Sequence, residues 1–184
     1  MSSRSERQRQ VKRALILVAV LIVVGLIITA VALIANRVSK TAIQDPMSVT
    51  IDVSVDGQKV QVKPYRVCDL FVPGEDSCTI HEENAAKVTI ADDQTADIEV
   101  GTAVGSNQWA VQRFYSDETV NSTSQHPAGE TEKETVAGSA SVNGQRTPLG
   151  VAEVSTALVG ENAAGEETTY GITWSIVNEA AAQK

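Results

Sequence analysis

The feature that most constrains this chain is an apolar run at residues 14–35, which contains no charged residue and one hydroxyl, at Thr29. As an α-helix, these 22 residues would extend about 33 Å. The hydrocarbon core of a bilayer is about 30 Å thick. The sequence therefore predicts one transmembrane helix at residues 14–35, through which the chain contacts membrane lipid.

The charges on either side of the run predict its orientation. Residues 1–13 hold five basic side chains against the single acid Glu6, and such basic flanks stay in the cytoplasm. Through Lys40 the chain has seven basic and one acidic residue, while the remainder has eight basic and 22 acidic residues. The resulting net charges are +6 and -14. We expect a single-pass protein of the cell membrane with a cytoplasmic N-terminus and an acidic extracytoplasmic domain, which repels nucleic acid.

A cleaved signal peptide has the same basic start and apolar core. Ala30, Val31 and Ala32 form a small-residue pattern at which a peptidase could cut. Signal-peptide cores span about 7–15 residues, fewer than the run seen here. This length favours a retained anchor, and cleavage remains the open alternative.

The sequence beyond the run changes from continuous to alternating apolar residues. A polar stretch ending in Pro46 indicates a stalk, and alternation over residues 47–55 indicates a half-buried strand. Asp56-Gly57 then predicts a tight hairpin to a second strand. The predicted plan is a cytoplasmic basic arm at 1–13, the span at 14–35, a stalk at 36–46, an extracytoplasmic β-sandwich domain at 47–178 and a tail at 179–184.

Short strands separated by turn residues recur along the rest of the domain, which is typical of an antiparallel β-sandwich. A helix over residues 152–159 is the alternative at one of these positions, although its β-branched content favours a strand. Trp109 and Trp174 lie in predicted strands and are expected in the core. The further predicted strands are Lys87–Ala91, Ala96–Val100, Gln108–Tyr115, Glu134–Val142, Ala152–Val159 and Thr168–Val177.

The chain has two cysteines, Cys68 and Cys78, and the predicted topology places both in an oxidising space. We therefore predict a disulfide between them. A zinc site is not favoured, because it needs three or four ligands and, besides the two cysteines, the chain has only His81 and His126 as histidines. A catalytic pair of a cysteine with His81 is a weaker alternative.

No catalytic motif is recognised in the sequence, so we predict no enzyme and no cofactor. The sequence lacks a G-x-S-x-G elbow, a phosphate-binding glycine loop and a nucleotide fingerprint. Asp92, Asp93 and Asp97 are more typical of a solvated turn than of a calcium site, because their spacing is not that of an EF-hand. The charged run at residues 129–138 is interpreted as a solvated edge.

The chain combines an N-terminal apolar segment and an early Val-rich hairpin with several short motifs: the Y-x-V-C-D-L element at Tyr65–Leu70, the second cysteine at Cys78, an N-Q-W strand ending at Tyr115-Ser116-Asp117, and T-W-S-I at Thr173–Ile176. Together these features resemble an uncharacterised family of actinobacterial cell-envelope proteins. The resemblance implies a bacterial envelope setting and a small immunoglobulin-like β domain. It assigns no activity and no functional residues.

The sequence thus predicts a membrane-anchored binding or scaffolding protein with an envelope protein as partner. An envelope enzyme, metal-assisted through the acidic turns, is one alternative. A small-ligand-binding module with a pocket rimmed by Arg113 or Tyr115 is another.

Overall fold

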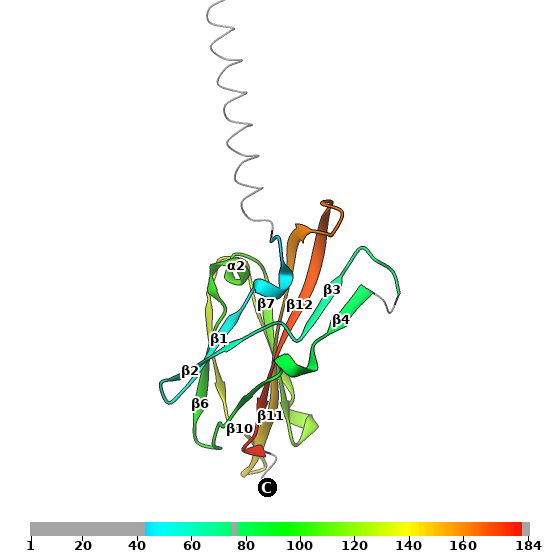
Figure 1. The fold of residues 1–184 in the computed structure, drawn as a ribbon. Coiled ribbons are helices and arrows are strands. Elements are labelled where there is room, and N and C mark those ends of the chain that lie inside the picture. The colour runs from blue at the N-terminus through cyan, green and yellow to red at the C-terminus, as the bar shows by residue number, and fades with distance from the viewer. Residues whose placement is uncertain (1–42, 75–76, 182–184) are drawn as a thin grey trace, which may run out of the picture. The chain divides into compact units, whose positions relative to one another are not determined.

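The computed structural model describes residues 43–74 and 77–181, which form a mainly β domain of two sheets that are antiparallel except for one parallel strand pair (Figure 1). One sheet has the order β2-β1-β6-β9, and the other has the order β4-β3-β12-β11-β7-β8, with β10 paired to β11 and β5 paired to β12. The strands are β1 Ile51–Val55, β2 Gln58–Val62, β3 Arg66–Asp69, β4 Cys78–Ile80, β5 Ala86–Val88, β6 Thr95–Glu99, β7 Trp109–Tyr115, β8 Ser122–His126, β9 Lys133–Ala137, β10 Ser139–Val142, β11 Gln145–Glu161 and β12 Glu167–Asn178. The helical elements are η1 Pro46–Ser48, η3 Glu82–Asn84, α2 Gly101–Gly105 and η4 Glu118–Val120.

Within residues 43–74 and 77–181, no helix has the length and hydropathy needed to cross a bilayer. The predicted basic arm, the predicted span at 14–35 and residues 36–42 of the predicted stalk lie outside the described residues, as does the end of the predicted tail.

The predicted first hairpin is confirmed. β1 and β2 pair antiparallel from Ile51↔Val62 to Val55↔Gln58. Asp56 and Gly57 between them have φ values of 48° and 78°, the left-handed geometry that a two-residue hairpin turn requires. The alternating residues Ile51 and Val53 point into the core, with 1% and 0% of their surface exposed.

The longest hairpin, β11–β12, forms the centre of the larger sheet. Its register runs from Val151↔Val177 to Glu161↔Glu167. The predicted strand at 152–159 lies inside β11, so the helical alternative is wrong. Ala152, Val154 and Leu158 are buried and lie at alternate positions. Side chains with a period of two share one face in a strand but not in a helix.

The predicted single strand at 134–142 is wrong, because it divides at Gly138 into β9 and β10. β9 pairs with β6 in one sheet, whereas β10 pairs with β11 in the other. A Cβ at Gly138 would lie 2.1 Å from the carbonyl oxygen of Ala91, so only glycine allows the chain to pass there. The alternating sequence continues through this change of sheet and therefore hid it.

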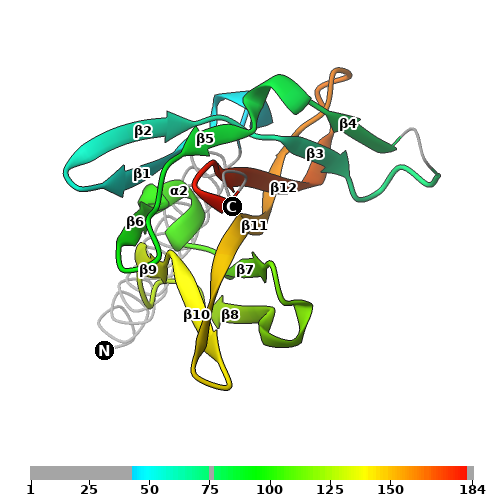
Figure 2. The ribbon, with the colours of Figure 1, turned by 90° about the horizontal axis from the view of Figure 1, so that it is seen from below.

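The two sheets pack against each other as a sandwich (Figure 2). Both tryptophans belong to the core between them. Trp109 and Trp174 expose 1% and 0% of their surface, which confirms their predicted place in the core. Each indole N–H finds a backbone acceptor: Trp174 donates to the carbonyl of Val49 at 3.0 Å, and Trp109 donates to that of Thr131 at 3.1 Å. Both bonds tie a strand of the larger sheet to a segment flanking the smaller one.

Candidate functional site

The two cysteines lie directly opposite each other on β3 and β4 and form a disulfide, as predicted. The bond closes a sequence separation of 10 residues. Because both cysteines of the chain are in this bond, neither offers a free thiol to a catalytic pair or to a metal. The alternative of a catalytic cysteine with His81 is therefore wrong. The His81 Nδ1 lies 3.4 Å from a carboxylate oxygen of Glu83 instead.

Exposed apolar side chains gather around this hairpin. Leu70, Phe71 and Val72 follow β3 and expose 56%, 74% and 45% of their surface, and Ile80 on β4 exposes 55%. We call these four residues the hairpin apolar surface. Leu70 lies over Gly171 of β12, where a Cβ would come within 3.1 Å of its Cδ2. Leu70, Phe71 and Val72 follow one another in the chain, whereas Ile80 pairs with Arg66 farther along β3. Consecutive exposed apolar residues of this kind commonly mark a binding surface.

Asp69 fixes the backbone that presents these side chains. Its Oδ1 accepts a hydrogen bond from the Thr168 hydroxyl at 2.6 Å and another from the Phe71 N–H at 3.0 Å. These two donors, the hydroxyl first, hold the pKa of Asp69 below its ordinary value of 3.8. The ionised carboxylate thereby links the turn after β3 to the start of β12.

A concavity of about 390 Å³ lies on the opposite face of the hairpin. Val67 and Asp69 of β3 and Thr79 of β4 line it together with His81 and Tyr170. Burial, followed by the nearby charge of Asp69, raises the pKa of the Tyr170 phenol. The phenol O–H donates to the backbone carbonyl of Glu161 at 3.1 Å, so it already has a protein acceptor.

A second polar site joins the two sheets at the other edge. Glu134 of β9 forms an ion pair with Arg113 of β7 and accepts a hydrogen bond from Ser124 of β8 at 2.6 Å. Its other oxygen lies 2.6 Å from Nε2 of His126. We call these four residues the Glu134 cluster. The side chains of Arg113, Glu134 and His126 are only 14%, 11% and 18% exposed, and the His126 ring stacks on Trp109 at 4.2 Å.

The alternation of each strand explains how the Glu134 cluster assembles. Arg113 follows the buried Trp109 and Val111 on β7 with a period of two, and Glu134 precedes the buried Val136 on β9. These charged residues therefore face inward. The carboxylate lies between the serine and the histidine, whereas a serine-hydrolase triad places the histidine between the other two. The arrangement acts as an ionic fastening between sheets.

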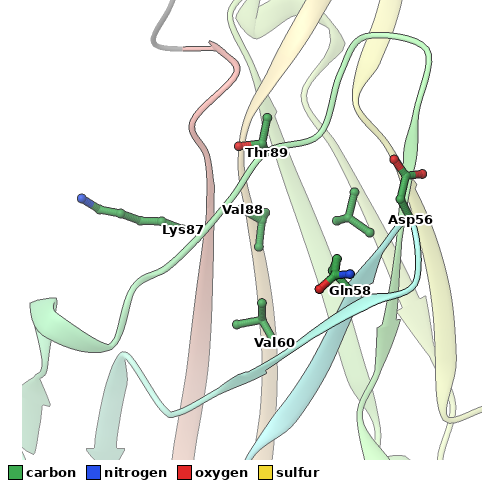
Figure 3. A pocket seen from close by; sticks show the side chains of 7 residues that line it. Asp56, Gln58, Val60, Lys87, Val88 and Thr89 are labelled. Atoms are coloured by element: carbon green, nitrogen blue, oxygen red, sulfur yellow. The ribbon is translucent and has the colours of Figure 1, made fainter.

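The groove in Figure 3 holds about 300 Å³ and lies between β2 and the β5 segment. Val60 and Val88 line it, and the Lys87 ammonium points away from it (Figure 3). Asp56, at one end, accepts a hydrogen bond from Gln94. The groove thus has apolar walls without converging charged groups.

Residues 44–179 match the family described as a protein of unknown function, DUF2771. The chain belongs to the DUF2771 family. The match includes the disulfide hairpin, the Glu134 cluster and both tryptophans. Neither a curated protein nor a solved structure matches the chain.

The calcium site and the ligand pocket that the sequence offered as alternatives in the DUF2771 domain concern Asp97, Arg113 and Tyr115. Asp97 accepts a hydrogen bond from the Thr135 hydroxyl at 2.7 Å. Across the described part of the chain, no three His, Cys, Asp or Glu residues come together as a metal site. Arg113 is held by Glu134, and neither it nor Tyr115 lines the concavities above.

Sequence reasoning missed the Glu134 cluster in the DUF2771 domain. Residues 129–138 were interpreted as a solvated edge because charges of both signs alternate there, but Glu134 is largely buried. The available signal was the spacing of Glu134 and Val136, which places the carboxylate on the same strand face as a core valine. The partner residues on β7 and β8 come from other parts of the sequence, so no local pattern links them.

Proposed function

We propose that this DUF2771 protein is a membrane-anchored, extracytoplasmic binding or scaffolding protein of an actinobacterial cell envelope, without catalytic activity. In this proposal, residues 14–35 cross the membrane with the N-terminus in the cytoplasm, and the β domain binds another envelope protein.

The disulfide between Cys68 and Cys78 is the observation that carries the proposal. Disulfides persist in oxidising compartments and are rare in the reducing cytosol. A bond between the sole two cysteines is therefore consistent with an exported domain. The basic residues before the apolar run support the same orientation independently.

The hairpin apolar surface supports a binding role. Phe71 exposes 74% of its surface on a domain whose two tryptophans are fully buried. Exposure of large apolar side chains is costly in water unless a partner covers them. The polar groups of the Glu134 cluster, in contrast, are satisfied within the domain.

We also propose that the sandwich is of the immunoglobulin-like type. Its two mainly antiparallel sheets and its tryptophans buried between them support this assignment. The disulfide joins neighbouring strands of one sheet, unlike the inter-sheet bridge of antibody domains, so it does not contribute to the argument.

Alkylation of intact bacterial cells expressing the full chain tests the anchored topology. A membrane-impermeant maleimide is expected to leave both cysteines unmodified until an external reductant is added, after which both react. The protein is also expected to stay in the membrane pellet after alkaline carbonate extraction. Free reaction without reductant, or release into the soluble fraction, would contradict the proposal.

A further inference from the structure

We propose that the hairpin apolar surface inserts into the interface of the lipid bilayer to which the chain is anchored. This inference rests on the proposed function, because it takes residues 14–35 to be a membrane anchor. The surface is thereby assigned to a lipid contact close to the anchor, which leaves the other faces of the domain available to a protein partner.

The first step is the length of chain between the predicted anchor and the domain. Eight residue steps separate Ala35, the last residue of the predicted span, from Ile43, the first described residue. A fully extended chain of that length reaches at most about 28 Å. An anchored chain must therefore hold Ile43 within that distance of the hydrocarbon core.

The second step is the position of the hairpin relative to Ile43. The Ile43 N–H donates to the carbonyl of Val159 on β11, and the Leu70 N–H donates to that of Thr169 on β12. Val159 and Thr169 are register partners. Ile43 and Leu70 therefore lie in one row across the sheet, separated by three strand spacings or about 15 Å. Figure 1 shows the β3–β4 hairpin at the end of the domain where the described chain begins.

The third step is the chemistry of the surface. The sequence from Leu70 to Gly74 has no charge, and its three apolar side chains are 45–74% exposed. Asp69, which precedes Leu70, is engaged by Thr168 and by the turn backbone. The acidic residues Glu75 and Asp76 follow Gly74 in the sequence, outside the uncharged stretch. Transfer of Leu, Phe and Val side chains from water into an apolar environment is favourable, and it does not depend on the charge of the lipid headgroup.

Electrostatics selects the kind of bilayer. Glu161 and Glu167 close the β11–β12 hairpin beside this row, and the chain beyond Lys40 carries a net charge of -14. Anionic headgroups therefore repel this end of the domain. Insertion is expected to depend on apolar contact, and to be stronger on zwitterionic than on anionic bilayers at low salt.

The test places an indole on the surface of the full chain reconstituted into vesicles of brominated phosphatidylcholine. Bromine quenches only fluorophores that reach the acyl chains. Phe71→Trp is compared with Phe114→Trp, a matched change at an exposed phenylalanine, 39% accessible. Phe114 pairs with Val151 on β11, nine residues or about 30 Å along the strand from the Gly160 bridge to Ile43. The native Trp109 and Trp174 are buried and give a constant background.

The fluorescence of Phe71→Trp is expected to be weaker in brominated than in unbrominated vesicles. The ratio of the two intensities for Phe114→Trp should equal that of the wild type. Equal signals from the two variants would overturn the inference and assign the surface to a protein partner. Quenching of Phe71→Trp that requires added phosphatidylglycerol would overturn the apolar mechanism. Flotation is measured first: a chain that fails to float with the vesicles contradicts the anchor, whereas a floating chain without quenching contradicts only the insertion.

Discussion

The two edges of the larger sheet are held in opposite ways. At the β4 edge, a covalent disulfide joins neighbouring strands, and apolar side chains face outward. At the β8 edge, an ion pair and two further polar contacts join β7 and β8 to β9 of the other sheet, and these charges face inward. The usual distribution of apolar and charged residues is thus inverted at both edges.

This contrast distinguishes residues that stabilise the fold from residues that can bind a partner. A buried carboxylate with three partners contributes to a defined register between two sheets, because each partner fits one geometry. An exposed apolar hairpin contributes nothing of this kind, and its disulfide holds the strands so that the apolar side chains remain presented. We therefore interpret the Glu134 cluster as a structural element and the hairpin apolar surface as the binding surface.

The largest expected effect on stability comes from Glu134→Ala. It leaves the Arg113 guanidinium largely buried without its carboxylate, since that side chain is 14% exposed. Removing one partner of a buried ion pair typically costs about 3 kcal/mol or more. The free energy of unfolding, measured by urea titration, should fall by about 3 kcal/mol. Lys133→Ala, at a neighbouring side chain that is 69% exposed, is the control and should change it by no more than about 0.5 kcal/mol.

A paired substitution sharpens the interpretation of the cluster. Arg113→Met combined with Glu134→Leu removes both charges, and well-packed apolar replacements of buried pairs are often close to neutral. The double variant should therefore be more stable than Glu134→Leu alone. A double variant as unstable as the sum of its single changes would show that the two side chains do not interact.

An intermediate effect is expected when both cysteines are replaced by serine. In the chain-entropy model, a loop of this length contributes about 2–3 kcal/mol through the unfolded state. Because β4 and β8 lie at opposite edges of the sheet, the loss should add to that of Glu134→Ala. Reduction of the wild-type protein should produce the same decrease, and an unchanged unfolding midpoint after reduction would contradict this role.

The same two edges show how far local sequence signals reach. The β1–β2 hairpin, the tryptophans and the disulfide follow from alternation, turn residues and cysteine count, which are local or compositional properties. β3, β4 and β8 were not predicted, because they are short and their few inward residues acquire meaning only through pairing with β12 and β7. The break at Gly138 likewise depends on a carbonyl 47 residues earlier in the sequence, that of Ala91.

The smallest predicted effect concerns the hydrogen bond between Thr168 and Asp69 at the base of the hairpin. Its contribution can be measured independently of the disulfide. Thr168→Val removes the hydroxyl that contributes most to lowering the pKa of Asp69, so this pKa should rise toward its ordinary value of 3.8. A carboxylate whose pKa is lowered on folding stabilises the native state above the unfolded pKa, and this contribution is lost as the pH falls through the folded pKa. The variant should therefore be less stable than the wild type at neutral pH.

The stability difference should begin to narrow as the pH falls below about 3.8, the ordinary pKa of the carboxyl group, and should be lost once the pH lies below the lowered pKa of Asp69 in the folded wild type. NMR titration of the carboxyl carbon measures the pKa directly. Thr119→Val is the matched control, because Thr119 lowers the pKa of Asp117 in the same way and makes no bond to Asp69. A pKa of Asp69 that is unchanged in Thr168→Val would mean that the backbone pairing of β3 with β12 holds the hairpin to β12 without help from the Asp69 carboxylate. The disulfide, which joins β3 to β4, would be unaffected in either case.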